Sequence, residues 1–206
     1  LGHRRLSIID LSPKGRQPMS DFSENIWVTC NGEIYNFTDL KRQLQGKGHL
    51  FHSDADTEVI IHGFKEWGVE VFDRMEGMFA FALWDKIKRQ LYLVRDGCGI
   101  KPLFYFYDGK TLVWSSEIKG LLASGLVERS IDKQSLSNYL SLAYIPNPKT
   151  ILENVCQVPP GTFVKFSKNG DPVSKKYWGL ENVTPQNWSG FSQENFNDRF
   201  REEVSL

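Results

Sequence analysis

The sequence predicts an α+β fold in which two mainly antiparallel sheets stack on one another, with helices on the outside. Two observations lead to this class. Between residues 36 and 67 the apolar residues recur every three to four positions, as in amphipathic helices. From residue 78 onward, aromatic-rich apolar segments follow one another in hairpins. Because helices and strands are grouped rather than alternating, we expect antiparallel sheets.

The N-terminal part of the chain is predicted to contain strands and loops. Residues 1–10 have strand-like content, and residues 12–18 are expected to form a loop because they contain proline and glycine. Residues 26–30 are predicted to be a buried strand. The Asn31-Gly32 dipeptide that follows favours positive φ and tight turns, so we expect the strand to end there.

Two amphipathic helices are predicted next. Residues 36–45 place Leu40 and Leu44 on one stripe, and a glycine follows them. Residues 57–67 carry apolar side chains at three-to-four spacing, and Gly68 ends that pattern.

Hairpins dominate the rest of the chain. They are predicted to pair residues 78–84 with 90–94, 103–107 with 111–114, and 161–166 with 173–178. The aromatic run at 78–84 is typical of a strand that is covered on both faces. Further helices are expected at 117–123, 133–142 and 193–204.

Composition excludes several classes of protein. The 206 residues are 40% hydrophobic and 24% charged, which are globular values. Twenty-five basic residues balance 25 acidic ones, so neither nucleic acid nor an anionic membrane is an expected partner. No apolar run approaches the roughly 18–20 residues of a membrane-spanning helix. An odd number of widely spaced cysteines argues against a disulfide framework and indicates the cytoplasm.

Single residues carry little chemistry by themselves. No phosphate-binding loop, nucleophile-elbow motif or zinc-spaced Cys/His group is present. The four histidines are scattered along the sequence and are interpreted as solvated or structural. Cys30 ends an apolar strand and is predicted to be a buried thiol, and Cys156 falls in an apolar loop. Cys98 lies between two glycines and is predicted to be exposed. No metal site is therefore predicted.

Six blocks of sequence carry most of the functional information. In order along the chain they are RLSIID (5–10), NGEIYN (31–36), SDADTE (53–58), GMFAFALWD (77–85), RDGCGIKPL (95–103) and SSEIK (115–119), with shorter blocks at 144–146, 158–161 and 177–178. Together they resemble the glutaminase domain of glutamine-hydrolysing asparagine synthetases. That domain is a class II glutamine amidotransferase of the N-terminal-nucleophile (Ntn) hydrolase fold.

The resemblance implies an αββα sandwich whose N-terminal strands are missing from these residues. It assigns residues 1–182 to the glutaminase domain, and residues 183–206 to a linker and the first helix of an ATP-dependent synthetase domain. No cofactor is implied for the first part, whereas ATP and Mg²⁺ are implied for the missing domain. The implied partners are glutamine and an amide acceptor, either aspartate or another carboxylate. Whether the protein forms a homodimer stays open.

The resemblance also implies residues that bind glutamine. Arg5 matches the arginine that binds the α-carboxylate, for which a planar, bidentate cation is suited. Asp56 matches the aspartate that binds the α-ammonium group, with Glu33 close to the same pocket. The backbone of one strand is expected to line the pocket edge at Leu6, Ser7, Ile8 and Ile9.

The catalytic residues that the resemblance implies are Asn31 and Gly32. The Asn31 side-chain amide and the Gly32 backbone N–H match the oxyanion hole, where two donors of this kind contribute about 3–4 kcal/mol each. Each assignment has a simpler alternative when taken alone. In these alternatives, Asn31-Gly32 forms a turn, Arg5 is a surface cation, and Asp56 is the N-cap of the helix that is expected to begin at Thr57.

In the family that this sequence resembles, the nucleophile is a cysteine at the mature N-terminus, and the α-amine of that cysteine is the general base. Residue 1 of this sequence is Leu, and neither Cys30 nor Cys98 occupies the required place. The sequence also departs from the family at Gly97 and Cys98, where relatives carry larger residues. We therefore expect no glutaminase turnover from these 206 residues alone.

Three hypotheses of function follow. The first is the glutaminase domain of an asparagine synthetase-like ligase, which releases ammonia from glutamine for an ATP-activated acceptor. The second is a domain that has lost its nucleophile and serves structure only, as in β-lactam-forming synthetases. The third is a non-enzymatic module that binds glutamine or a partner. A cysteine directly after the initiator methionine of the full-length protein would distinguish the first from the second.

Overall fold

A computed structural model of the chain describes residues 1–3, 10, 12–168, 170–182 and 192–204. The larger of its two sheets has the strand order β1 (Met19–Ser20), β2 (Ile26–Ile34), β3 (Gly77–Asp85), β4 (Gln90–Arg95), β8 (Thr162–Ser167) and β9 (Val173–Lys176). The smaller sheet has the order β6 (Leu112–Ser115), β5 (Phe104–Tyr107) and β7 (Val155–Gln157). Every pair of neighbouring strands is antiparallel.

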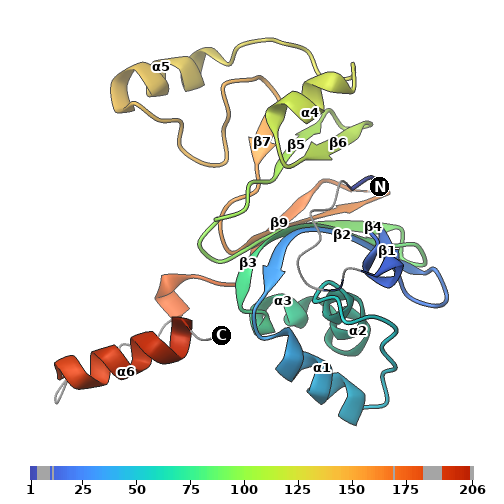
Figure 1. Ribbon diagram of the computed structural model, residues 1–206. Coiled ribbons are helices and arrows are strands. Elements are labelled where there is room, and N and C mark those ends of the chain that lie inside the picture. Colours follow the sequence, from blue (N-terminus) through green and yellow to red (C-terminus); the bar gives the residue numbers. More distant parts are fainter. Residues whose placement is uncertain (4–9, 11, 169, 183–191, 205–206) are drawn as a thin grey trace.

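Helices cover both outer faces of the stacked sheets (Figure 1). Against the larger sheet lie α1 (Phe37–Gly46), α2 (Glu58–Trp67) and the short α3 (Val71–Arg74), and against the smaller sheet lies α4 (Ile118–Ala123). Two further helices, α5 (Lys133–Leu142) and α6 (Gln193–Val204), extend away from these layers. The predicted αββα architecture is therefore confirmed.

The alternation of side chains along β3 explains why the larger sheet is covered on both faces. Phe79, Phe81 and Leu83 pack into the core beneath the helices, whereas Ala80 and Ala82 face the smaller sheet. Large side chains on the helix side and small ones between the sheets let the two sheets approach closely. The apolar run predicted to be buried on both faces is buried in this way.

The smaller sheet divides its aromatic side chains in the same manner. Tyr105 and Tyr107 of β5 point into the layer between the sheets, and Phe104 and Phe106 point outward beneath α4. Leu121 of α4 is fully buried against that outer face. The hairpins and helices predicted from residue 78 to residue 142 are confirmed within one or two residues.

Two expectations about strands are wrong. The strand expected to end at Cys30 continues to Ile34, because Asn31 and Gly32 pair with β3 instead of forming a turn. Cys156 lies in strand β7 rather than in a loop, where it pairs with Tyr105. The strand-like content expected at residues 4–9 falls outside the described residues.

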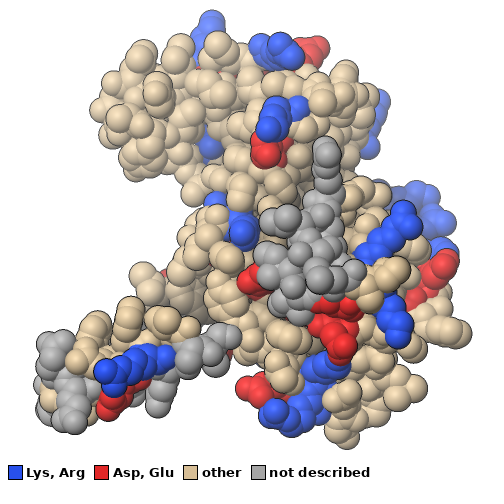
Figure 2. All heavy atoms as spheres, viewed as in Figure 1, with Lys and Arg blue, Asp and Glu red and all other residues tan. Residues whose placement is uncertain are grey.

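Charges of both signs lie on the same face of the molecule. On the face seen in Figure 2, lysine and arginine side chains are interspersed with aspartate and glutamate, as the balanced composition predicts. Within the described part of the chain, no helix has the length and apolar character needed to cross a membrane.

Phe72 of α3 should be among the residues most important for stability. It is fully buried and meets the rings of Phe64, Phe81, Tyr92, Phe163 and Tyr177. We expect Phe72→Ala to lower the free energy of unfolding by about 3–5 kcal/mol, measured by urea denaturation. Phe22→Ala is the control, because Phe22 is 95% exposed and should change stability by less than about 0.5 kcal/mol. Equal effects of the two substitutions would contradict this packing.

Candidate functional site

Two glycines with positive φ lie where the C-terminal half of β2 pairs with β3. Gly32 has φ 143°, and a Cβ atom at this position would overlap the Met78 carbonyl and the Phe79 Cα. Gly77 on β3 has φ 149°, and a Cβ atom there would overlap the Glu33 carbonyl. Glycine is therefore required on both strands by backbone contact, and the Asn31-Gly32 pair marks this contact rather than a turn.

Asn31 lines a cavity of about 630 Å³ between the two sheets. Its side-chain Nδ2 donates a long hydrogen bond of 3.4 Å to Ser116 Oγ, at the end of β6. Thr29, Ser115 and Ser116 add further polar groups to the cavity wall. The predicted oxyanion residue thus presents its amide donor to a cavity large enough for a small substrate.

Asp56 is buried, with 7% of its surface exposed, and lies against the end of β2. Its Oδ2 accepts a hydrogen bond from the Ile34 N–H at 2.9 Å, and its Oδ1 accepts one from the Thr57 N–H at 2.8 Å. The alternative in which Asp56 caps the helix at Thr57 is wrong. Helix α2 begins at Glu58, its N-cap is Thr57, and no side chain caps it.

Of the predicted substrate residues that the structure describes, Asn31, Gly32 and Glu33 lie on β2, and Asp56 contacts the end of that strand at Ile34. Ile34 is three positions after Asn31, which corresponds to about 10 Å of strand. Glu33 is half-buried and lies on the same face of the strand as Asn31. The distance along β2 between the proposed oxyanion donor, Asn31, and the residue that the buried Asp56 carboxylate contacts is therefore about the length of a small substrate. Arg5, Leu6, Ser7, Ile8 and Ile9 fall outside the described residues.

Gln17 is a positioning residue that the sequence did not indicate. Its Oε1 accepts a hydrogen bond from the Cys30 N–H at 2.6 Å, and its Nε2 donates to Thr57 Oγ1 at 3.2 Å. One amide thus connects β2 to the loop that carries Asp56. Gln17 lies in a segment predicted only as a loop, and no local pattern distinguishes it from other polar loop residues.

Glu58 fixes the loop before α2. Its carboxylate accepts hydrogen bonds from the His52 N–H at 2.8 Å, the Ser53 N–H at 2.8 Å and the Ser53 hydroxyl at 2.6 Å. Burial by itself would raise its pKa, but hydrogen bonds from His62, Ser53 and His52 lower the pKa of Glu58 to about 2. The carboxylate therefore stays ionised and holds the segment leading to Asp56.

Two histidines belong to the same structural network. The Nδ1 atoms of His49 and His62 lie 3.2 Å apart, and their Nε2 atoms contact Glu66 at 3.0 Å and Glu58 at 3.4 Å respectively. The structural interpretation is confirmed for this pair, although the two residues are not scattered in space. Among the described residues, no cluster of three or more His, Cys, Asp or Glu side chains could hold a metal ion.

The RDGCGIK block forms a rigid loop. Asp96 is completely buried and accepts hydrogen bonds from the Ile100 and Lys101 N–H groups, both at 2.9 Å. The Arg95 guanidinium donates to the carbonyl oxygens of Gly99, Lys101 and Val158 at 2.6–2.8 Å. These hydrogen bonds hold the loop in place, so Arg95 and Asp96 have a structural role.

The described cysteines differ in their surroundings. Cys30 is buried, and burial together with the nearby Asp56 charge raises the pKa of its thiol well above its ordinary value. Cys156 is half-buried in β7, and Cys98 is exposed on the Arg95–Lys101 loop. The predictions that Cys30 is buried and Cys98 accessible are confirmed.

Stacked antiparallel sheets between helices, with a polar cavity beside β2, fit a class II glutamine amidotransferase domain of the Ntn-hydrolase fold. The chain belongs to the glutamine amidotransferase domain family, which it matches over residues 1–178. The solved structure of a glutamine phosphoribosylpyrophosphate amidotransferase from Bacillus subtilis, complexed with ADP and GMP, has the same fold. Its TM-score is 0.61 at 20% identity, and the alignment covers 85% of this chain and 34% of that one.

Several similar proteins are named asparagine synthetases. Asparagine synthetase [glutamine-hydrolyzing] 1 of Bacillus subtilis (strain 168) is 40% identical over 178 residues, covering 86% of this chain and 28% of that protein. Putative asparagine synthetase [glutamine-hydrolyzing] 2 of Methanocaldococcus jannaschii is 33% identical over 202 residues, covering 90% of this chain and 39% of that protein. The chain thus spans between a quarter and two fifths of the length of these relatives.

Stability should depend on pH through Glu58. Because its folded pKa is about 2 and its ordinary value 4.5, ionised Glu58 stabilises the fold fully above pH 4.5 and loses this effect as pH falls toward 2. We expect Glu58→Gln to cost roughly 2–3 kcal/mol of unfolding free energy at pH 7. The difference from the original protein should narrow between pH 4.5 and pH 2, measured by urea denaturation at each pH. Glu70→Gln, at an exposed site, is the control for the loss of one carboxylate. If the difference in unfolding free energy between Glu58→Gln and the original protein stays constant down to pH 2, the prediction is contradicted.

Proposed function

We propose that this chain is the glutaminase domain of an asparagine synthetase-like ligase. It would hydrolyse glutamine to glutamate and ammonia, and the ammonia would serve the ATP-dependent amidation of aspartate or a similar carboxylate. The observation that carries this proposal is the arrangement along β2, where Asn31 lies about 10 Å and Gly32 about 7 Å from the strand end that Asp56 contacts. Family membership over residues 1–178 and the names of the relatives support it.

The proposed chemistry assigns each of these residues a step. A cysteine thiolate attacks the side-chain amide carbon of glutamine, and the carbonyl oxygen becomes an oxyanion. Donors from the Asn31 amide and the Gly32 N–H stabilise that charge. The C–N bond then breaks, and the leaving nitrogen departs as ammonia with the proton that the α-amine had accepted from the thiol. Water hydrolyses the remaining thioester to glutamate and regenerates the thiol.

Substrate binding would use opposite charges at the other end of glutamine. Asp56 is the proposed partner of the α-ammonium group, with Glu33 nearby, and Arg5 is the proposed partner of the α-carboxylate. Leu6, Ser7, Ile8 and Ile9 would line the same pocket. A buried carboxylate whose oxygens already accept backbone N–H bonds keeps a fixed orientation, which suits recognition of one cation.

The nucleophile is proposed to come from an N-terminal cysteine of the intact protein. Cys30 is unsuited to this role, because its thiol is buried and its pKa is raised. Residues 1–182 would form the glutaminase domain, and α6 would begin a second, synthetase domain. ATP and Mg²⁺ would act in that second domain, and the cytoplasm is the proposed location.

A second candidate function is a structural domain without a nucleophile, like that of β-lactam-forming synthetases. A cysteine directly after the initiator methionine of the full-length protein supports hydrolysis, and its absence supports the structural domain.

Two substitutions in the full-length protein test the proposed roles. Asn31→Ala should lower glutaminase kcat by about 100- to 1000-fold, because one oxyanion donor is lost. Asp56→Ala should raise the KM for glutamine. Ammonia-dependent amidation should survive both substitutions, because it does not use the glutamine pocket. Asn138→Ala on α5 is the matched control. Loss of both activities in the Asn31 variant would contradict an oxyanion role.

The isolated 206-residue chain should not hydrolyse glutamine. Its cysteines do not include the N-terminal thiol and α-amine that the proposed mechanism requires. Ammonia release from the purified chain should equal the rate without protein, measured with a coupled glutamate dehydrogenase assay. Release above that rate, abolished by Cys30→Ser or Cys98→Ser, would overturn the proposed source of the nucleophile.

A further inference from the structure

We propose that Gln17 and Thr57 are positioning residues for glutamine recognition, because they link the backbone of β2 to the Asp56 carboxylate. The inference rests on the proposed function, in which Asp56 binds the α-ammonium group of glutamine. It adds a physical connection between the two ends of the substrate site. One end is formed by Asn31 and Gly32 on β2, and the other by Asp56 on the loop before α2.

The edge of β2 that faces away from β3 presents three N–H groups beyond its pairing with β1. They belong to Cys30, Gly32 and Ile34, because the N–H groups of alternate residues point to opposite edges of a strand. Gln17 Oε1 accepts the first at 2.6 Å, and Asp56 Oδ2 accepts the third at 2.9 Å. The N–H between them, that of Gly32, is the proposed oxyanion donor. Side chains therefore hold the strand on both sides of the group that would act on the substrate amide.

A short chain of hydrogen bonds continues from Gln17 to Asp56. Gln17 Nε2 donates to Thr57 Oγ1 at 3.2 Å. Because this oxygen accepts the amide hydrogen, the hydroxyl directs its own hydrogen toward Asp56 Oδ1, 3.5 Å away. The Thr57 N–H donates to the same Oδ1 at 2.8 Å. The Gln17 amide thus orients a hydroxyl that acts directly on the carboxylate.

This relay gives the Asp56 loop a second attachment to β2. The direct bond from the Ile34 N–H holds the loop at one point of the strand. The relay holds it at Cys30, four residues earlier, which corresponds to about 13 Å of strand. Two separated attachments fix the direction of the carboxylate as well as its position. Thr57 and Asp56 are only 3% and 7% exposed, so water competes little for these bonds.

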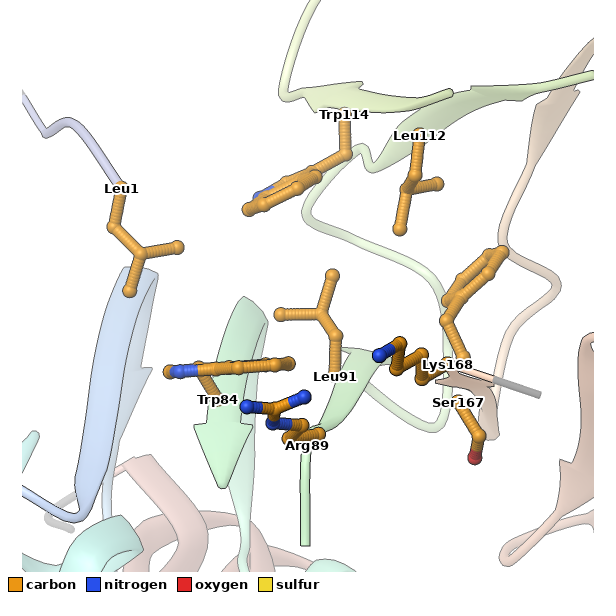
Figure 3. Close-up of a pocket in the computed structure, with 9 residues that line it drawn as sticks. Leu1, Trp84, Arg89, Leu91, Leu112, Trp114, Ser167 and Lys168 are labelled. Atoms are coloured by element: carbon orange, nitrogen blue, oxygen red, sulfur yellow. The ribbon is translucent and has the colours of Figure 1, made fainter. Parts of the chain in front are cut away.

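The relay runs along the edge of β2 and does not enter the layer between the sheets. Figure 3 shows Trp84 of β3 and Trp114 of β6 on opposite sides of a cavity of about 580 Å³ in that layer. Neither Gln17 nor Thr57 lines this cavity or the one beside Asn31. Changes to the relay should therefore leave the packing between the sheets as it is.

The test compares glutamine with glutaramate, the same molecule without its α-ammonium group, in the full-length protein. Gln17→Met keeps the length of the side chain and removes both hydrogen bonds. We expect it to raise the KM for glutamine about tenfold, with a smaller change in kcat, measured by ammonia release. The Ki of glutaramate, measured as a competitor of glutamine, should stay within about twofold, because this compound has no group for Asp56 to bind.

The Thr57 hydroxyl provides an independent test. Thr57→Val keeps the shape of the side chain and removes the hydroxyl, so it should raise the KM for glutamine as Gln17→Met does. Thr57→Ser keeps the hydroxyl, and its KM should be closer to that of the original protein than to that of Thr57→Val. Gln17→Met combined with Asp56→Ala should have a KM within about twofold of Asp56→Ala alone, because the relay acts through Asp56.

Gln45→Met, at an exposed position of α1, is the matched control and should leave all of these constants unchanged. Ammonia-dependent amidation, retained by each variant, shows that the protein is folded. Equal weakening of glutamine and glutaramate by Gln17→Met would overturn the inference, as would effects that multiply in the double variant with Asp56→Ala. Both results leave the proposed function intact if the original protein hydrolyses glutamine. Absence of that hydrolysis would overturn the proposed function and this inference together.

Discussion

The contact between the backbones of β2 and β3 at Gly32 and Gly77 is the constraint on which the site depends. Each glycine lies against a carbonyl of the opposite strand, so the two strands meet without intervening side chains. This approach lets Asn31 and Glu33 project from a strand that is paired with β3 along its whole length. It also places the Ile34 N–H where the Asp56 carboxylate can accept its hydrogen bond. A side chain at either glycine would separate the strands and move the groups proposed to bind glutamine.

Buried carboxylates hold the loops around this contact. Asp56, Glu58 and Asp96 each accept at least two backbone N–H bonds, and each is at most 7% exposed. Ionised oxygens are strong acceptors, and their burial limits competition from water. A chain with zero formal net charge thus places several negative charges in its interior, where they set loop geometry. Gln17 serves the same purpose with a neutral amide.

Most of the fold follows from patterns within the sequence, because the periodicity of apolar residues records which faces are buried. Helix α2 and the hairpin of β3 and β4 were predicted in this way. The turn expected at Asn31-Gly32 was wrong, since turn preference is local and the contact with β3 is made by residues about 45 positions away. Strand β7 is three residues long and gave no periodic signal. At the site, family resemblance indicated Asn31 and Asp56, whereas Gln17 and Ser116 act through contacts that join distant segments.

The loop from Arg95 to Lys101 has an experimental consequence. Hydrogen bonds to Arg95 and Asp96 fix both ends of the loop, and Cys98 is exposed between them. Of the other two cysteines, Cys30 is buried and Cys156 is half-buried. Within these 206 residues, a maleimide dye or spin label should therefore attach first to Cys98 without any engineered cysteine. Because hydrogen bonds hold both ends of its loop, such a label would report distances within this chain with little blurring from local motion.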